Sequence, residues 1–167
     1  MNNILNIIYT MKKAEIISIG ELRKVSLNKF KESNPRRELF PKGTKKQLIV
    51  GDCVVRAIVH VTGKGYRETF RDLMEYALHH PTCQPFNFDD VFGDYLEEVL
   101  GAVKHKPKRK ANGKTYEVRR FPASKDKSYI IKTTTHVTSI VGGVHLDSWN
   151  CGAWRANTYW EIDKDSL

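Results

Sequence analysis

The stretch Gly51-Asp52-Cys53-Val54-Val55-Arg56-Ala57-Ile58 decides the fold predicted for this chain. Its apolar residues recur at helical spacing as far as Val61, Asp52 is a typical N-cap residue, and Thr62-Gly63 ends the pattern. The stretch therefore predicts a helix that begins at Cys53. The unpaired N–H groups and the positive dipole end of a helix start favour thiolate, and they lower a cysteine pKa from its free value of about 8.5. Cys53 is thus a candidate nucleophile.

Helical patterns come first in the chain and strand patterns follow. Two further helices are predicted over 66–79 and 88–100, where Pro81 and Gly101 end them. Beyond Gly101 the apolar period changes to two. It predicts strands over 115–121, 128–133 and 158–162, and a hairpin over 136–149. This order predicts an α+β fold in which N-terminal helices pack on a C-terminal antiparallel sheet.

The length of 167 residues predicts a single domain with its own core. Residues 1–46 are interpreted as an irregular N-terminal extension that contains a short helix over 21–30. Residues 47–167 are interpreted as the domain, with a basic insertion at about 104–120.

The predicted hairpin brings a histidine and an aspartate together. If Gly142-Gly143 is a two-residue turn, Thr138 lies opposite Asp147, and His136 shares their face. His136 and Asp147 then form a diagonal pair roughly 7–8 Å apart between backbones, within reach of a hydrogen bond. His145 shares this face and is not excluded, but His136 opens the strand, where a cleft is easier to reach. Cysteine, histidine and aspartate are the groups of a nucleophile, its base and an orienting acid.

Other side chains are candidates for supporting roles. Gln47, six residues before Cys53, is a candidate oxyanion donor beside the Cys53 N–H. Trp149 and Trp154 are candidate cleft-lining residues, and burial in the core is the alternative for them.

A metal site is the alternative use of cysteine and histidine. His79-His80-Pro81-Thr82-Cys83 gathers three ligands, but the remaining ligand would be Cys151 or His145, which lack paired spacing. The sequence therefore predicts no metal and no cofactor, and Cys83 and Cys151 are interpreted as structural.

Charge and cysteine content suggest partners and a compartment. The formal net charge is +9, and eight basic residues lie within 104–120. The candidate anion-binding residues are Lys104, Lys106, Lys108, Arg109 and Lys110. They make nucleic acid or an acidic protein a candidate partner, with a solvated surface as the alternative. No apolar run approaches about 18 residues, so no membrane span is expected. Three cysteines fit a reducing, cytoplasmic location.

The order of these residues resembles that of papain-like cysteine peptidases. In that order a cysteine begins a helix, a histidine opens a strand and an aspartate lies on the next strand. The stretches 51–58 and 136–149 more narrowly resemble a family of small phage and prophage proteins with a papain-like core. The resemblance covers about 47–162. It implies Cys53 as nucleophile, His136 as base, Asp147 as orienting acid and Gln47 as oxyanion residue.

The implied function is a thiol hydrolase, either a peptidase, an isopeptidase or an amidase, acting on a protein or peptide. A phage-encoded enzyme would act on a host protein in the host cytoplasm. Two alternatives stay open. One is a catalytically inactive papain-like protein that binds nucleic acid or an acidic partner through its basic surface. The other is a thiol-dependent acyl transferase, which uses the same three residues on a different acceptor.

Overall fold

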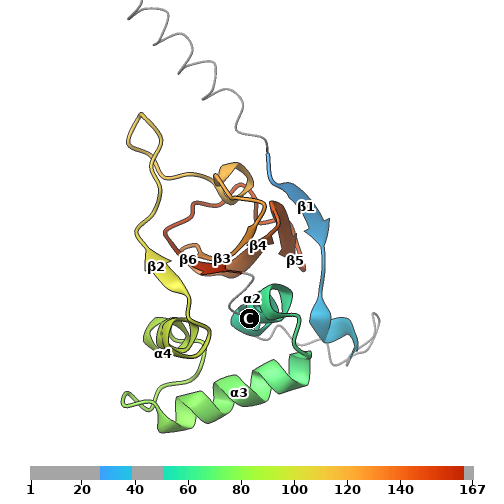
Figure 1. Cartoon of the computed structure of the whole chain (residues 1–167), viewed down its shortest axis with the longest axis vertical. Coiled ribbons are helices and arrows are strands. Elements are labelled where there is room, and N and C mark those ends of the chain that lie inside the picture. Colours follow the sequence, from blue (N-terminus) through green and yellow to red (C-terminus); the bar gives the residue numbers. More distant parts are fainter. Residues whose placement is uncertain (1–26, 39–50, 164–167) are drawn as a thin grey trace, which may run out of the picture.

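A computed structural model describes residues 27–38 and 51–163, and within them the fold is α+β (Figure 1). The α-helices are α2 (Cys53–Thr62), α3 (Tyr66–His79) and α4 (Asp89–Asp94), which continues as the π-helix η2 (Tyr95–Val99). Two short 3-10 helices are η1 (Pro35–Glu38) and η3 (Val118–Arg120). The strands are β1 (Lys29–Glu32), β2 (Val103–His105), β3 (Lys127–Lys132), β4 (Val137–Val141), β5 (Val144–Asp147) and β6 (Thr158–Asp163).

Among the described residues the strands form one six-stranded sheet in the order β1-β5-β4-β3-β6-β2. Every neighbouring pair is antiparallel except β1 and β5, which are parallel. The prediction of an antiparallel sheet is therefore confirmed for the C-terminal strands β2 to β6, and β1 makes the whole sheet mixed. The difference comes from β1, which lies in the segment interpreted as an extension. β1 is four residues long, and only Phe30 is partly buried. Because β1 is a short, charged edge strand, its sequence shows no alternation of apolar and polar residues that would predict a strand.

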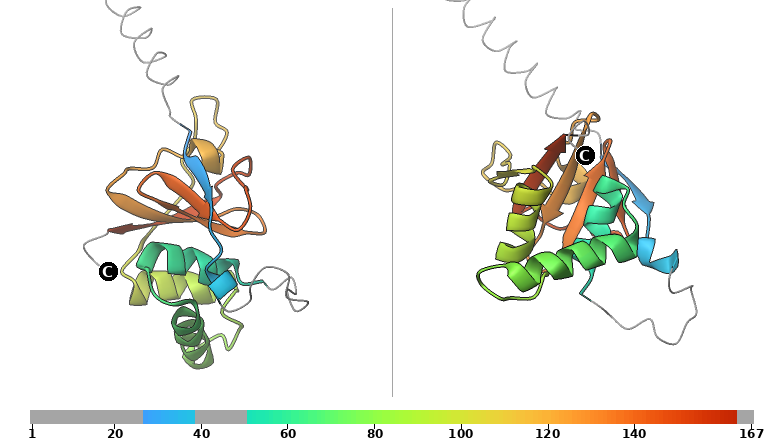
Figure 2. Two further views of the ribbon diagram at one scale, coloured as in Figure 1. Left: turned by 90° about the vertical axis from the view of Figure 1, so that its right-hand side faces the viewer. Right: turned by 60° about the horizontal axis from the view of Figure 1, so that its bottom comes forward.

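The helices cover one face of the sheet (Figure 2). α2 packs directly against β4, and α3 packs on α2 (Figure 1). The core beneath the helices contains Val55, Ile58 and Leu96 together with Ile130 and Trp160 of the sheet. None of the helices in the described part of the chain is long and apolar enough to cross a membrane.

A second core covers the opposite face of the sheet. β3 sends Tyr129 and Ile131 to this side, where they pack with Val118, Phe121 and Tyr159. The side chains of β3 therefore alternate between two cores, and both faces of the strand are buried.

The predictions of helices over 66–79 and from Cys53 to Gly63 are confirmed. The predicted strand over 115–121 is wrong, because its residues pair with a loop rather than with a strand. The Val118 and Arg119 N–H groups donate to the Trp154 and Gly152 carbonyls, and residues 118–120 form η3. The predicted helix over 21–30 is wrong at residues 29–30, which belong to β1; residues 21–26 lie outside the described residues.

Candidate active site

The hairpin of β4 and β5 has the predicted register. Val141 pairs with Val144 and Ile140 pairs with His145. Gly142 and Gly143 have φ angles of 58° and 77°, the left-handed values that a two-residue hairpin turn requires. His136, directly before β4, and Asp147, the last residue of β5, therefore meet at the open end of the hairpin.

His136 and Asp147 form a buried hydrogen-bonded pair. His136 Nε2 lies 2.7 Å from Asp147 Oδ2, and the two side chains are 8% and 3% exposed. The other carboxylate oxygen accepts a hydrogen bond of 2.7 Å from the Ser148 N–H. Burial alone would raise the pKa of Asp147, but the hydrogen bonds from His136, Thr138 and the Ser148 N–H, together with the charge of His136, lower it. Burial alone would lower the pKa of His136, but hydrogen bonds with Asp147, Cys151 and Cys53, together with the charge of Asp147, raise it to about 11.

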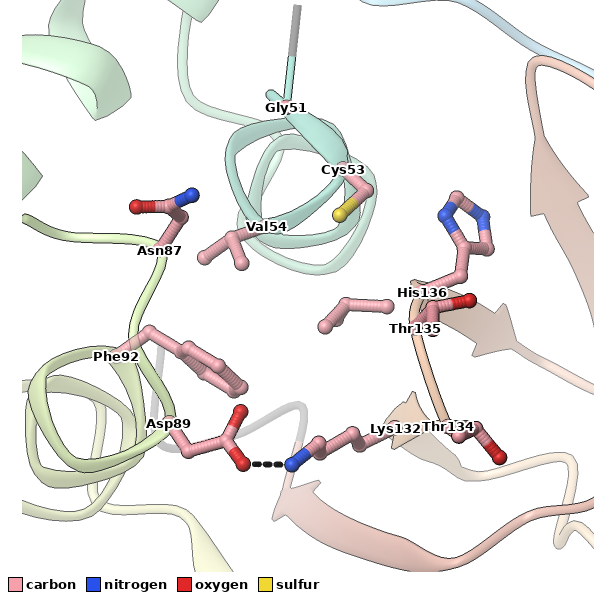
Figure 3. Close-up of a pocket in the computed structure, with 11 residues that line it drawn as sticks. Gly51, Cys53, Val54, Asn87, Asp89, Phe92, Lys132, Thr134, Thr135 and His136 are labelled. Atoms are coloured by element: carbon pink, nitrogen blue, oxygen red, sulfur yellow. Dashed lines mark ion pairs between the residues drawn. The ribbon is translucent and has the colours of Figure 1, made fainter.

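Cys53 is the first residue of α2, and its side chain lies next to His136 in the same pocket (Figure 3). Burial alone would raise the pKa of the thiol. Hydrogen bonds from the His136 side chain and the Val137 N–H oppose this effect, so that the pKa is lowered. The three side chains therefore favour a thiolate at Cys53, an imidazolium at His136 and a carboxylate at Asp147.

Asp52 is the N-cap residue of α2, as predicted, but its side chain makes no cap hydrogen bond. Its buried carboxylate instead forms an ion pair with Arg56 and accepts a hydrogen bond of 2.8 Å from the Tyr66 hydroxyl. Arg56 thus offsets a negative charge that lies next to the thiolate, and it also helps to lower the pKa of Cys53.

Gln47 lies outside the described residues, so its role as an oxyanion donor stays a prediction.

Cys53 and His136 line a pocket of about 300 Å³ between α2, α4 and the segment before β4 (Figure 3). Its lining is mainly polar beyond these two residues. An ion pair between Asp89 and Lys132 spans it. The other lining residues are Gly51, Val54, Asn87, Phe92, Thr134, Thr135 and Val137.

Trp149 and Trp154 do not line this pocket, although they were candidates for that role. Their rings lie with centroids 5.1 and 6.2 Å from the centroid of the His136 ring. Both are about two-fifths exposed, so they are not core residues either. They cover His136 from the solvent side and help to fix its orientation.

Two further residues, Cys151 and His145, lie beside His136 and Asp147. Cys151 is fully buried, with Sγ 3.6 Å from Asp147 Oδ2 and 3.3 Å from His145 Nε2. His145 is fully buried, and its Nε2 lies 3.0 Å from Thr138 Oγ1. Cys151 follows Asp147 by four residues and His145 by six. This short spacing was the sequence signal that could have placed Cys151 near both residues. The sequence offered both residues only as ligands of a metal site with 79–83, and His145 also as the alternative to His136; in the structure His80 pairs with Thr82 and Asp94 instead.

Six of the eight basic residues of 104–120 have partners within the fold. Glu117 forms ion pairs with Lys110, Arg119 and Arg120 of this segment and also with Arg155. Lys104 pairs with Glu97 at 3.4 Å, and Lys108 lies over the rings of Phe121 and Tyr159. Arg109 donates to the Gly113 carbonyl at 2.8 Å. Part of the positive charge is thus compensated internally.

Comparisons of the chain with protein-family models, with curated proteins and with solved structures each found no match.

Proposed function

We propose that the protein is a thiol hydrolase that cleaves an amide, peptide or isopeptide bond and that its fold is papain-like. The observation that carries the proposal is the position of His136 between Cys53 and Asp147. The imidazole is hydrogen-bonded to the buried carboxylate on one side, and it lowers the thiol pKa on the other. This is the arrangement of an activated nucleophile with an oriented base.

The proposed reaction uses His136 first as an acid and then as a base. The Cys53 thiolate attacks the carbonyl carbon, and the negative charge moves to the carbonyl oxygen near the Cys53 N–H. The C–N bond breaks as His136 gives its proton to the leaving amine, and a thioester remains. Neutral His136 then takes a proton from water, whose oxygen attacks the thioester. The C–S bond breaks, releasing a carboxylic acid and restoring the thiolate.

The pocket favours a polar substrate group. Asp89 and Lys132 offer an acceptor and a donor, and Asn87 and Thr135 add further polar groups to its wall. A protein or peptide segment with a polar side chain next to the cleaved bond fits this lining. We propose the reducing cytoplasm as its location, because the mechanism needs a free thiol.

Two alternatives share parts of this site. An acyl transferase would form the same thioester but pass the acyl group to an acceptor other than water. A binding protein would retain the fold and use the basic residues of 104–120 for nucleic acid or an acidic partner. A hydrolase and an acyl transferase both form an acyl-enzyme, whereas a binding protein does not. Detection of an acyl-enzyme therefore separates the two enzymes from the binding protein.

Acylation by p-nitrophenyl acetate tests the proposal. We expect a burst of p-nitrophenolate of about one equivalent per chain and the mass of one acetyl group on the peptide that contains Cys53. Cys53→Ala should abolish both. The control Cys83→Ala removes an exposed thiol outside the site and should change neither. Acetylation of Cys83 or Cys151 in place of Cys53, or no burst, would contradict the proposed nucleophile.

A further inference from the structure

Donor atoms of four buried side chains gather on the side of His136 that faces away from Cys53. We refer to them as the four-donor cluster: His136 Nε2, His145 Nε2, Asp147 Oδ2 and Cys151 Sγ. The donor atoms of His136, Asp147 and Cys151 all lie within 4.8 Å of one another. His145 Nε2 lies outside this group of three but is 3.3 Å from the Cys151 sulfur and 3.0 Å from Thr138 Oγ1. All four side chains are buried.

We propose that the four-donor cluster binds a zinc ion and that bound zinc holds the catalytic residues in an inactive arrangement. Imidazole, thiolate and carboxylate are the ligands that zinc takes in proteins. A tetrahedral zinc site with metal–ligand distances of about 2.0–2.3 Å places neighbouring donors about 3.3–3.8 Å apart. The Cys151 sulfur already meets this spacing, at 3.6 Å from Asp147 Oδ2 and 3.3 Å from His145 Nε2.

Charge also favours a divalent cation in the cluster. On binding zinc, Cys151 would give up its proton, and its thiolate together with the Asp147 carboxylate would carry two negative charges, which match the charge of Zn²⁺. A buried ion is tolerated only when such compensation is present. His145 Nδ1 is buried without a hydrogen-bond partner among the described residues, so within them the ring makes its polar contacts through the nitrogen that points at Cys151.

Zinc binding would break the hydrogen bond between His136 and Asp147, although Cys53 would not be a zinc ligand. The hydrogen bond of 2.7 Å between His136 and Asp147 is shorter than the spacing of two zinc ligands, so the metal must separate the pair. His136 would then coordinate zinc through Nε2, and it would no longer receive its orientation from Asp147. The cluster can bind metal whether or not Cys53 is catalytically active.

Titration of the full chain with Co²⁺ tests the proposal. Tetrahedral Co²⁺ with a thiolate ligand gives intense visible bands and a near-ultraviolet charge-transfer band. We expect both bands to saturate at about one Co²⁺ per chain and Zn²⁺ to displace the cobalt. Cys151→Ser should remove the charge-transfer band. The double variant Cys53→Ser/Cys83→Ser, whose remaining thiol is Cys151, should retain it in full.

The double variant decides the outcome even if circular dichroism shows that Cys151→Ser does not fold. Loss of the charge-transfer band in the double variant would place the thiolate ligand at Cys53 or Cys83 and overturn the proposal. Absence of the band in the parent chain would overturn it as well. Retention in the double variant supports the proposal, independently of whether p-nitrophenyl acetate acylates Cys53.

Discussion

Replacing His136 by alanine will slow the acylation of Cys53 by p-nitrophenyl acetate about 10²–10⁴-fold near neutral pH, the usual contribution of a positioned general acid or base. The variant loses the imidazolium that stabilises the thiolate and also the proton donor and acceptor of the reaction. The measurement is the pre-steady-state release of p-nitrophenolate, with circular dichroism to confirm folding.

His79→Ala is the matched control for this change. His79 is exposed on α3 and pairs with Glu75, so its removal takes away a histidine without touching the site. The acylation rate of this variant should equal that of the parent chain. An equal rate in a folded His136→Ala protein would mean that Cys53 acts without a base, and the assignment of His136 would be wrong.

Replacing Asp147 by asparagine will slow acylation by up to about 10⁴-fold, the loss that the same change produces in a serine–histidine–aspartate triad. Asparagine preserves the size of the side chain but removes the charge that raises the pKa of His136, and it can present an N–H where Nε2 now donates. The imidazole then loses its favoured tautomer. The rate of p-nitrophenolate release from the folded variant measures the effect.

Asp126→Asn provides the control, because Asp126 is an exposed aspartate that accepts a hydrogen bond from Ser124. It should acylate at the parent rate. If Asp147→Asn also reacts at the parent rate, the carboxylate has a structural role only, and the site is a cysteine–histidine dyad.

The sequence predicted the elements whose signals are local. Helical periodicity ended by Gly63 and by Pro81 identifies α2 and α3, because glycine and proline act on the backbone around them. The Gly142-Gly143 turn sets the register of the hairpin, and the register alone brings His136 within reach of Asp147. These predictions needed no knowledge of tertiary packing.

Features that depend on distant packing were beyond the reach of the sequence. β1 joins the sheet beside β5, which follows it by more than a hundred residues. In the 115–121 segment Val118 and Phe121 pack in a core, but residues 118–120 form η3 and their backbone bonds to a loop. Asp52 is the N-cap residue of α2, but Arg56 and Tyr66 bind its carboxylate. The position of Cys151 beside Asp147 follows from the fold of the loop after β5.

The pH dependence of Cys53 alkylation by iodoacetamide tests the coupling of Cys53 to His136 most directly. Thiolate reacts and thiol does not, so the rate falls as the pH drops through the Cys53 pKa. Because that pKa is lowered, we expect Cys53 to react faster than Cys83 and Cys151 between about pH 6 and 7, as followed by peptide mapping. In His136→Ala the midpoint should move to higher pH, with little labelling left in that range. Superimposable curves for the parent and the folded variant would show that Cys53 is not coupled to His136 and would contradict the hydrolase assignment.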